Sequence, residues 1–210
     1  MEACLDAALK DILPVMQDST MNGTTYWGIA TLKSPIDAWI YQEILFETRP
    51  DVIVEIGNHH GGSLLMLAHW CDAMGHGKVV GVDLSHHAVP AKVREHGRVT
   101  LIDGDACESL AQVQRHISPG ERVLVIEDSA HTFDNTLQVL RCYAALVQPG
   151  GYFIVEDGIC HHGLDVGPDP GPYEAIEAFL AENRDFEADR RRERFLVTWN
   201  PKGYLRRRAA

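Results

Sequence analysis

Short apolar runs rich in β-branched residues recur along the chain, and stretches with helical periodicity separate them. The runs predict strands near 51–56, 78–83, 98–103, 122–127 and 151–156. The stretches between them predict helices near 61–74, 106–116 and 132–147. This regular alternation is typical of a parallel sheet whose crossover helices cover its faces.

The pattern changes after the fifth predicted strand. Residues 157–173 are rich in glycine and proline and show no periodicity, and a helix near 172–183 follows them. Two more strands are predicted near 186–190 and at 194–200, and the short spacer between them indicates an antiparallel hairpin. The expected fold is α/β: a doubly wound, Rossmann-like, mostly parallel seven-stranded sheet with an antiparallel C-terminal hairpin.

The first 50 residues precede the sheet. Ser34 and Pro35 have the residue types of a helix N-cap and a first helical position, which predicts a helix from there to about residue 46. Its inward face is expected to carry Trp39, Ile40, Ile44 and Leu45. Residues 17–31, polar and rich in glycine and threonine, are expected to be loose or part of a lid. We therefore divide the chain into an N-terminal helical or lid segment, 1–50, and a ligand-binding domain, 51–210.

Charge and hydropathy exclude some classes of function. The formal net charge of −11 argues against nucleic acid as the main partner. Arginines gather near the C-terminus, where we expect a solvated edge and tail: Arg190, Arg191, Arg192, Arg194, Arg206, Arg207 and Arg208. The chain has no apolar stretch of about 18 or more residues and no signal peptide, so we expect a cytoplasmic protein that does not enter a membrane.

The cysteines point to the same compartment. There are five of them, Cys4, Cys71, Cys107, Cys142 and Cys160, and no CxxC pair. An odd number without a paired motif fits a reducing cytosol. We expect Cys71, Cys107 and Cys142 to be ordinary buried small residues.

Carboxylates stand at the ends of three predicted strands. Glu55 ends the first, Glu127 and Asp128 the fourth, and Glu156 and Asp157 the fifth. Ligands of open α/β sheets bind outside the carboxyl ends of the strands, so these acids should converge on one pocket. Burying so much like charge without a partner would cost several kcal/mol. A cation should therefore join them, either a metal, a cationic cofactor or both.

A glycine-rich loop between the first strand and its helix is the second candidate feature. Glycines let a ligand approach the backbone and the helix N-terminus. Asp83 lies 21 residues after Gly62, where a carboxylate can grip ribose hydroxyls. The GxGxxG spacing of dinucleotide sites is absent. Glu55 suits the sulfonium and ammonium groups of S-adenosylmethionine better than a pyrophosphate.

Seven residues are thus candidates for binding S-adenosylmethionine: Glu55, Gly57, His59, Ser63, Asp83, Asp105 and Ala106. Asp105 is placed to meet an adenine edge, and it also has the residue type of an N-cap for the helix that follows. Both roles are compatible. His60 is expected to be a loop residue near the cofactor.

Several motifs together resemble one family. They are Tyr26-Trp27-Gly28, the loop 55–63, Asp128-Ser129-Ala130-His131, Val155-Glu156-Asp157, Gly171-Pro172-Tyr173-Glu174-Ala175 and Trp199-Asn200-Pro201-Lys202-Gly203-Tyr204-Leu205. In this order they are similar to the cephalosporin hydroxylase family. Its members are class I S-adenosylmethionine-dependent methyltransferases, typically of bacterial natural-product pathways. The resemblance covers the chain from about Tyr26 to Leu205.

A looser resemblance to catechol and macrolide-sugar O-methyltransferases implies a metal site. It assigns Mg²⁺ or another divalent cation to Asp128, Glu156 and Asp157, and the catalytic roles to Asp128 and His131. Such an ion lowers the pKa of a bound hydroxyl and fixes its position. His131 would accept the proton. His161 and His162 could touch substrate or add a ligand, and Glu127 is expected to pack at the sheet.

We therefore expect an S-adenosylmethionine- and Mg²⁺-dependent O-methyltransferase of secondary metabolism, such as antibiotic biosynthesis. Its partner would be a small natural product, with a sugar, diol or catechol-like hydroxyl. Two alternatives stay open: N-methylation of a natural-product amine, and a non-catalytic S-adenosylmethionine-binding accessory protein to a hydroxylase. The missing GxGxxG weakens a third, a nicotinamide dehydrogenase. The family resemblance also implies a homo-oligomer.

Overall fold

A computed structural model describes residues 5–209, so Cys4 lies outside the described residues. One seven-stranded sheet has the order β5-β4-β3-β6-β7-β9-β8. The strands are β3 Val52–Ile56, β4 Lys78–Asp83, β5 Val99–Asp103, β6 Val123–Glu127, β7 Tyr152–Val155, β8 Phe186–Ala188 and β9 Tyr204–Arg207. The strands β5, β4, β3, β6 and β7 pair in parallel, and β9 pairs antiparallel with both β7 and β8. The predicted fold class is confirmed.

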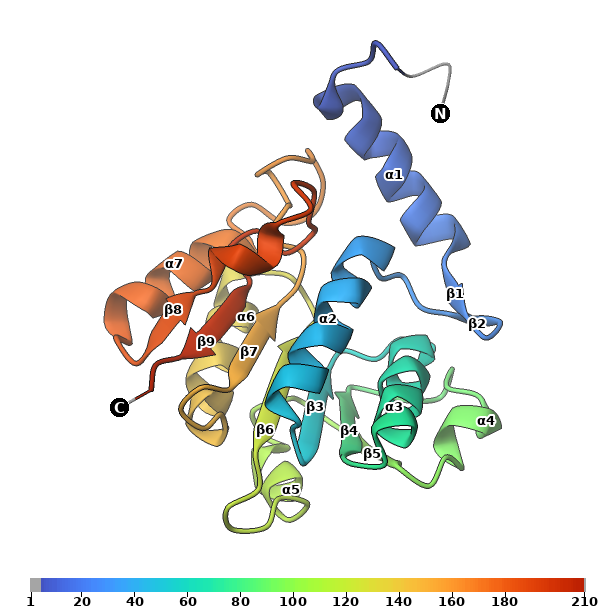
Figure 1. The fold of residues 1–210 in the computed structure, drawn as a ribbon, viewed down its shortest axis with the longest axis vertical. Coiled ribbons are helices and arrows are strands. Elements are labelled where there is room, and N and C mark those ends of the chain that lie inside the picture. Colours follow the sequence, from blue (N-terminus) through green and yellow to red (C-terminus); the bar gives the residue numbers. More distant parts are fainter. Residues whose placement is uncertain (1–4, 210) are drawn as a thin grey trace.

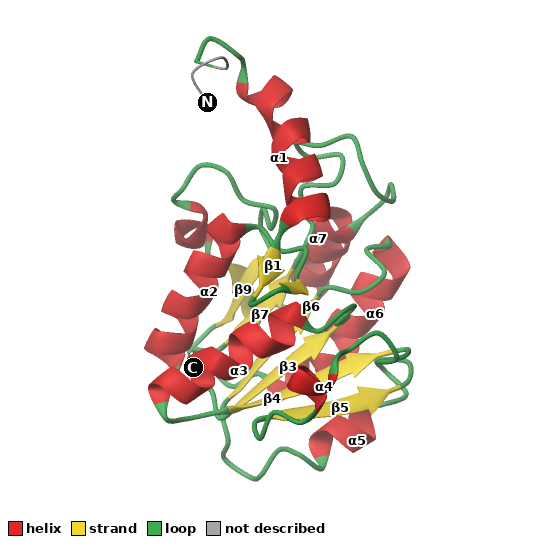
Figure 2. Cartoon of the chain, turned by 90° about the vertical axis from the view of Figure 1, so that its right-hand side faces the viewer, coloured by secondary structure: helices red, strands yellow, loops and turns green. Residues whose placement is uncertain are grey.

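Helices cover both faces of this sheet (Figures 1 and 2). The helices of the described residues are α1 Leu9–Gly23, which lies outside the layers that cover the sheet, α2 Pro35–Thr48, α3 Gly62–Met74, α4 Ala91–Arg94, α5 Leu110–Gln114, α6 Phe133–Tyr143 and α7 Pro172–Glu182, with short 3₁₀ turns at Ala144–Leu146 and Arg190–Glu193. Figure 2 shows the sheet between α2 and α3 on one side and α6 and α7 on the other. The chain therefore forms three layers, as the alternation of strands and helices predicts.

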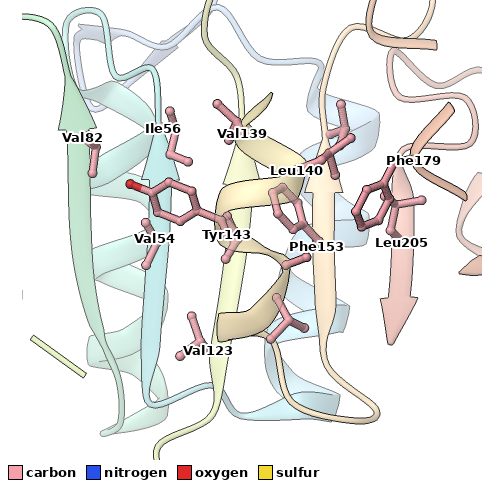
Figure 3. Close-up of a cluster of buried hydrophobic side chains, with 14 of the residues drawn as sticks. Val54, Ile56, Val82, Val123, Val139, Leu140, Tyr143, Phe153, Phe179 and Leu205 are labelled. Atoms are coloured by element: carbon pink, nitrogen blue, oxygen red, sulfur yellow. The ribbon is translucent and has the colours of Figure 1, made fainter. Parts of the chain in front are cut away.

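Alternate residues of the strands supply the two cores. Val54 and Phe153 pack with Tyr143 of α6 and Phe179 of α7, as Figure 3 shows. The strand residues that alternate with these, such as Ile53, point to the other face and pack against α2 and α3. Because both faces are covered, the parallel strands are apolar throughout rather than alternating.

The last strand does not lie where the sequence predicted it. Residues 194–200 were expected to be a strand, but they run as turns, and Leu196 is 91% exposed with a positive φ. The apolar residues of this segment serve other contacts, because Trp199 packs with Leu13 and Ile159 beside the sheet. Tyr204–Arg207 forms the strand instead, so β8 and β9 are antiparallel neighbours without a tight hairpin.

Three smaller expectations are also wrong. Trp39 is 59% exposed, although its neighbours Ile40, Ile44 and Leu45 are buried as predicted. The helix predicted at 106–116 is regular only at Leu110–Gln114. Cys107 and Cys142 form a disulfide, since the turn before α5 lies against α6, a contact between residues 35 apart in sequence. Cys71 is buried and free, as expected.

The described part of the N-terminal 50 residues, 5–50, contains two helices and a short hairpin. α1 projects from the body of the molecule (Figures 1 and 2) and its Leu13 packs beside Leu164. A short hairpin, β1 Thr25–Tyr26 and β2 Ile29–Ala30, joins it to α2. Ser34 caps α2 as predicted, with its Oγ accepting from the N–H of Asp37 at 3.4 Å. Across residues 5–209, no helix combines the length and the apolar character needed to cross a membrane.

Candidate active site

A cavity of about 750 Å³ lies at the carboxyl ends of the parallel strands. Its walls come from the loops after β3, β4, β5, β6 and β7, together with Thr31 and Leu32 of the N-terminal segment. It brings together nine predicted site residues: Gly57, His59, Ser63, Asp83, Asp105, Ala106, Asp128, His131 and Asp157. The predicted residues Glu55 and Glu156 do not line this cavity and lie behind its wall.

The glycine loop and the loop after β6 touch through their backbones. Gly57 has a positive φ of 86°, and a Cβ there would overlap the carbonyl oxygen of Asp128. Glycine is therefore required at this position for two reasons, its conformation and the close approach of Asp128. The contact places the predicted cofactor loop directly beside the predicted metal loop.

Asp83 lines the cavity and also holds the glycine loop. Its Oδ2 accepts hydrogen bonds from the backbone N–H groups of Asn58, at 2.7 Å, and His59, at 3.1 Å. His59 follows with a positive φ of 47°. The carboxylate thus fixes the turn that presents the loop to a ligand, in addition to the ribose contact expected of it.

A buried histidine that sequence reasoning missed supports the same loop. His86 is 1% exposed, and its Nε2 lies 2.7 Å from Oδ1 of Asn58. Its Nδ1 pairs with Asp103 at the end of β5. The side chain therefore ties the glycine loop to two neighbouring strands. Its sequence neighbour His87 is exposed, so only the fold distinguishes the two.

Asp105 does not take the helix N-cap position that the sequence offered it, because α5 begins at Leu110 with Ser109 as its N-cap; it closes the preceding turn instead. Its Oδ1 accepts from the N–H groups of Cys107, at 2.9 Å, and Glu108, at 3.1 Å. These bonds close the turn before α5 and leave the residue exposed at the cavity. Asp105 therefore lies where it could also make the adenine contact expected from the sequence.

A lysine occupies the centre of the acidic cluster. Lys33 is 5% exposed, and its Nζ donates to Oδ2 of Asp128 at 2.7 Å and to Oε1 of Glu156. The same Nζ lies 3.2 Å from Oε1 of Glu55, whose Oε2 accepts from Ser63 Oγ at 2.8 Å. We expected a metal or a cationic cofactor to supply the positive charge that compensates these acids. The ammonium group of Lys33 supplies part of that charge. Nothing near Lys33 in sequence signals partners that lie 95 and 123 residues away.

On the cavity side, Asp128 faces a different pair of groups. Nε2 of His131 lies 3.8 Å from Oδ1 of Asp128 and 3.5 Å from Oδ2 of Asp157. His131 and Asp157 both have positive φ, 55° and 57°, which is uncommon for residues with a Cβ. Such strain is typical of functional sites. Asn200 supports the arrangement, since its Oδ1 accepts from the N–H of Asp157 and its Nδ2 donates to the Tyr41 hydroxyl.

The ionisation of these groups shows an excess of negative charge. Burial raises the pKa of Asp128 and Asp157, and burial together with the Asp128 charge raises the pKa of Glu156 to about 7. Burial alone would lower the pKa of His131, but the charges of Asp157 and Asp128 outweigh it and raise the pKa. Hard carboxylate oxygens with uncompensated charge are the donors that a divalent cation prefers. The donor set therefore fits Mg²⁺.

Among residues 5–209, candidate ligand atoms fall into two groups that share Asp128. Asp128, His131 and Asp157 lie within 4.8 Å of one another, and so do Glu55, Asp128 and Glu156. The first group faces the cavity and the second surrounds Lys33. Of the predicted ligand set, Asp128 and Asp157 are thus on the cavity wall, while Glu156 is held by Lys33.

His60 lines the cavity, as expected of a loop residue there, whereas His161, His162 and Glu127 lie away from the cavity wall. Nε2 of His162 pairs with Glu174, and its ring stacks on Tyr173 at 3.7 Å between centroids. His161 pairs with Asp165 at 3.1 Å. Glu127 is buried as expected, and burial raises its pKa to about 8.

Known proteins are similar to this chain in sequence and in fold. The family model Rhamnosyl O-methyltransferase/CmcI matches residues 18–208. The rhamnosyl O-methyltransferase of Mycobacterium tuberculosis (strain H37Rv) is 37% identical over 190 residues, 87% of this chain and 77% of that protein. The Mycobacterium leprae protein of the same name is 35% identical over 195 residues, 89% of this chain and 84% of that protein. The solved structure "cmcI-D160 Mg-SAM" superposes with a TM-score of 0.67 at 28% identity, covering 89% of this chain and 77% of that one.

Proposed function

The chain belongs to the rhamnosyl O-methyltransferase/CmcI family and is an S-adenosylmethionine-dependent methyltransferase, and we propose that it methylates a sugar hydroxyl with the help of a divalent cation. One observation carries this proposal: a single cavity joins the glycine loop at Gly57 to the pair Asp128 and Asp157 with His131 between them. A cofactor site and a base beside hard oxygen ligands are the parts that hydroxyl methylation needs.

The cofactor would lie along the loops after β3, β4 and β5. The backbone at Gly57 and Ser63 would approach its methionine end, near the N-terminus of α3. Asp83 would accept from the ribose hydroxyls, and Asp105 with Ala106 would meet the adenine. These residues all line the cavity. Glu55, behind the wall, would contribute its charge at a distance and hold Ser63 in place.

The acceptor would bind on the side of the cavity formed by Asp128, His131 and Asp157. A divalent cation held by Asp128 and Asp157, with Glu156 close behind, would lower the pKa of the acceptor hydroxyl. Nε2 of His131 would take the proton from that hydroxyl as the oxygen attacks the methyl group. Asn200 keeps Asp157 in position, because its Oδ1 accepts from the Asp157 N–H.

The relatives support the proposed acceptor class. Those from Mycobacterium are named for rhamnosyl groups. A sugar hydroxyl, on rhamnose or a similar sugar of a natural product, is therefore our proposal. The N-terminal segment would contribute to acceptor choice, because Met21, Thr31 and Leu32 line the cavity.

The test is a transfer assay with isotope-labelled S-adenosylmethionine and a panel of rhamnosides, catechols and amines. We expect labelled methyl ethers of the rhamnosides, formed only when Mg²⁺ is present and lost in excess EDTA. Products only from amines would support N-methylation instead. Tight cofactor binding with no product from any acceptor class would support the accessory protein. Full activity in EDTA would remove the metal from the proposal.

We also propose a homo-oligomer. Trp39 and Phe46 are exposed on α2, and a monomer in water gains nothing from large exposed apolar side chains. Light scattering after size exclusion would give the mass in solution, with a monomer contradicting the proposal.

A further inference from the structure

Lys33 occupies an unusual place for a lysine. It lies between the β1–β2 hairpin and α2, and its side chain is 4% exposed. A buried ammonium is costly unless carboxylates surround it. Here its Nζ lies within 3.2 Å of oxygens from Glu55, Asp128 and Glu156, one carboxylate for each N–H that it can donate.

The charge of the cluster is not balanced by Lys33 alone. Four carboxylates lie together here, those of Glu55, Asp128, Glu156 and Asp157, against one ammonium group. His131 faces two of the acids at the cavity edge. A divalent cation and a sulfonium ligand would bring in the remaining positive charge.

The two oxygens of Asp128 divide this cluster into a protein side and a cavity side. Oδ2 accepts from Lys33 at 2.7 Å, while Oδ1 faces His131 at 3.8 Å. Glu55 and one oxygen of Glu156 belong to the protein side with Lys33. The cavity side keeps Oδ1 of Asp128 and Oδ2 of Asp157.

We propose that Lys33 is a built-in counter-ion of the metal site, a positioning residue that stabilises the acidic cluster before a metal binds and weakens the affinity for that metal. This inference rests on the proposed function, because it takes the divalent cation to bind beside Asp128 and Asp157. The ammonium repels a cation a few ångströms away and occupies oxygens that the cation could otherwise use. The protein can therefore fold without metal and release it readily.

The test compares the parent with Lys33→Met, which keeps most of the aliphatic stem and removes the charge. Thermal unfolding in EDTA should show a lower Tm for the variant, since three buried acids lose their partner. Added Mg²⁺ should raise the Tm of the variant more than that of the parent. Titration calorimetry should give an Mg²⁺ Kd lower by about tenfold or more, as expected from removing a nearby like charge. Lys202→Met, which breaks the more exposed pair with Glu177, is the control and should change neither quantity.

A second variant separates charge from packing and serves if Lys33→Met does not fold. In Lys33→Met/Glu55→Gln, one buried negative charge leaves with the positive one, while the Gln oxygen can still accept from Ser63. We expect its Tm in EDTA to recover towards the parent value. Recovery would not follow if Lys33 only filled space.

The outcomes distinguish this inference from the proposed function. No Mg²⁺ binding to the parent would contradict the metal part of the proposed function, while the EDTA measurements still test the counter-ion. Mg²⁺ binding to the parent that is unchanged or weaker in Lys33→Met would overturn the inference alone. So would a double variant no more stable in EDTA than Lys33→Met.

Discussion

Nε2 of His131 lies 3.5 Å from Oδ2 of Asp157, so a candidate base and a candidate metal ligand face each other across the acceptor side of the cavity. Both residues have positive φ, a backbone conformation that is uncommon for residues with a Cβ. The negative charge of Asp157 raises the pKa of the imidazole against the effect of burial. A neighbouring cation would offset that charge, so the metal and the base are electrostatically linked.

Replacing the base should slow transfer without affecting cofactor binding. We expect His131→Ala to lower kcat by about 10²–10⁴-fold, the usual contribution of a positioned base. His131 acts only when neutral, so kcat of the parent should rise with pH as the imidazole loses its proton. Asp157 and Asp128 raise the pKa of that imidazole without metal, and a bound cation would offset the shift. The measurement is kcat against pH, with S-adenosylhomocysteine affinity by calorimetry. His161→Ala, outside the cavity wall, is the control, and near-parent kcat in His131→Ala would make His131 a pocket wall only.

Removing the carboxylate at the end of β4 should weaken the cofactor. Asp83→Ala deletes a charge-assisted contact to ribose and the acceptor for the N–H groups of Asn58 and His59, so we expect a loss of about 2–3 kcal/mol. Calorimetry with S-adenosylhomocysteine should give a Kd higher by roughly 30- to 150-fold. Asp165→Ala, at a side chain 99% exposed, should bind like the parent. Parent-like affinity in Asp83→Ala would place the cofactor elsewhere.

The acid after β7 should be needed for metal but not for cofactor. Asp157→Ala removes one of the cavity-facing oxygen ligands, so Mg²⁺ binding and Mg²⁺-stimulated turnover should be lost. S-adenosylhomocysteine should still bind, because most of the proposed contacts come from the loops after β3, β4 and β5. Calorimetry with each ligand in turn makes the measurement. Mg²⁺ affinity equal to that of the parent would exclude Asp157 as a ligand.

A carboxylate far from the cavity should make stability depend on acid pH. Burial disfavours ionised Asp189, but hydrogen bonds from Arg191 and Tyr152 outweigh it and lower the pKa to about 2. A lowered pKa stabilises the fold above the unfolded value near 3.8, and this contribution is lost as pH falls through about 2. Asp189→Asn should lower the free energy of unfolding at pH 7 by about 1–2 kcal/mol.

That difference should shrink as the pH falls below about 4. The free energy of unfolding of parent and variant, measured with denaturant at pH 7 and again below about pH 4, makes the comparison. Glu95→Gln, at an exposed position, should show no such trend. A deficit in Asp189→Asn that is equal at both pH values would mean that the carboxylate acts through packing rather than charge.

The parallel part of the fold could be predicted because its signals are local. Each strand from β3 to β7 is a short apolar run, and the runs of β3, β6 and β7 end at acids whose place at the sheet edge follows from parallel pairing. The segment 194–200 has the same apolar character but no partner strand, since Tyr204–Arg207 takes that position between β7 and β8. The local pattern of apolar residues does not determine whether 194–200 or 204–207 pairs with the sheet.

The site was predictable on its acidic side and not on its basic one. Asp128 and Asp157 could be predicted as site residues because they follow the ends of recognisable strands. Lys33 and His86 could not, because the residues that they contact lie far away in sequence and on different strands. The disulfide between Cys107 and Cys142 was missed for the same reason.

The backbone contact between Gly57 and Asp128 has a consequence for how this enzyme family can diversify. Two loops that touch main chain to main chain cannot drift apart when side chains around them are exchanged. If the proposed function holds, this one backbone contact sets the separation between the methyl donor and the acceptor oxygen. New acceptors could then be accommodated by changing Met21, Thr31 and Leu32 on the cavity wall, while the contact between the two loops stays as it was.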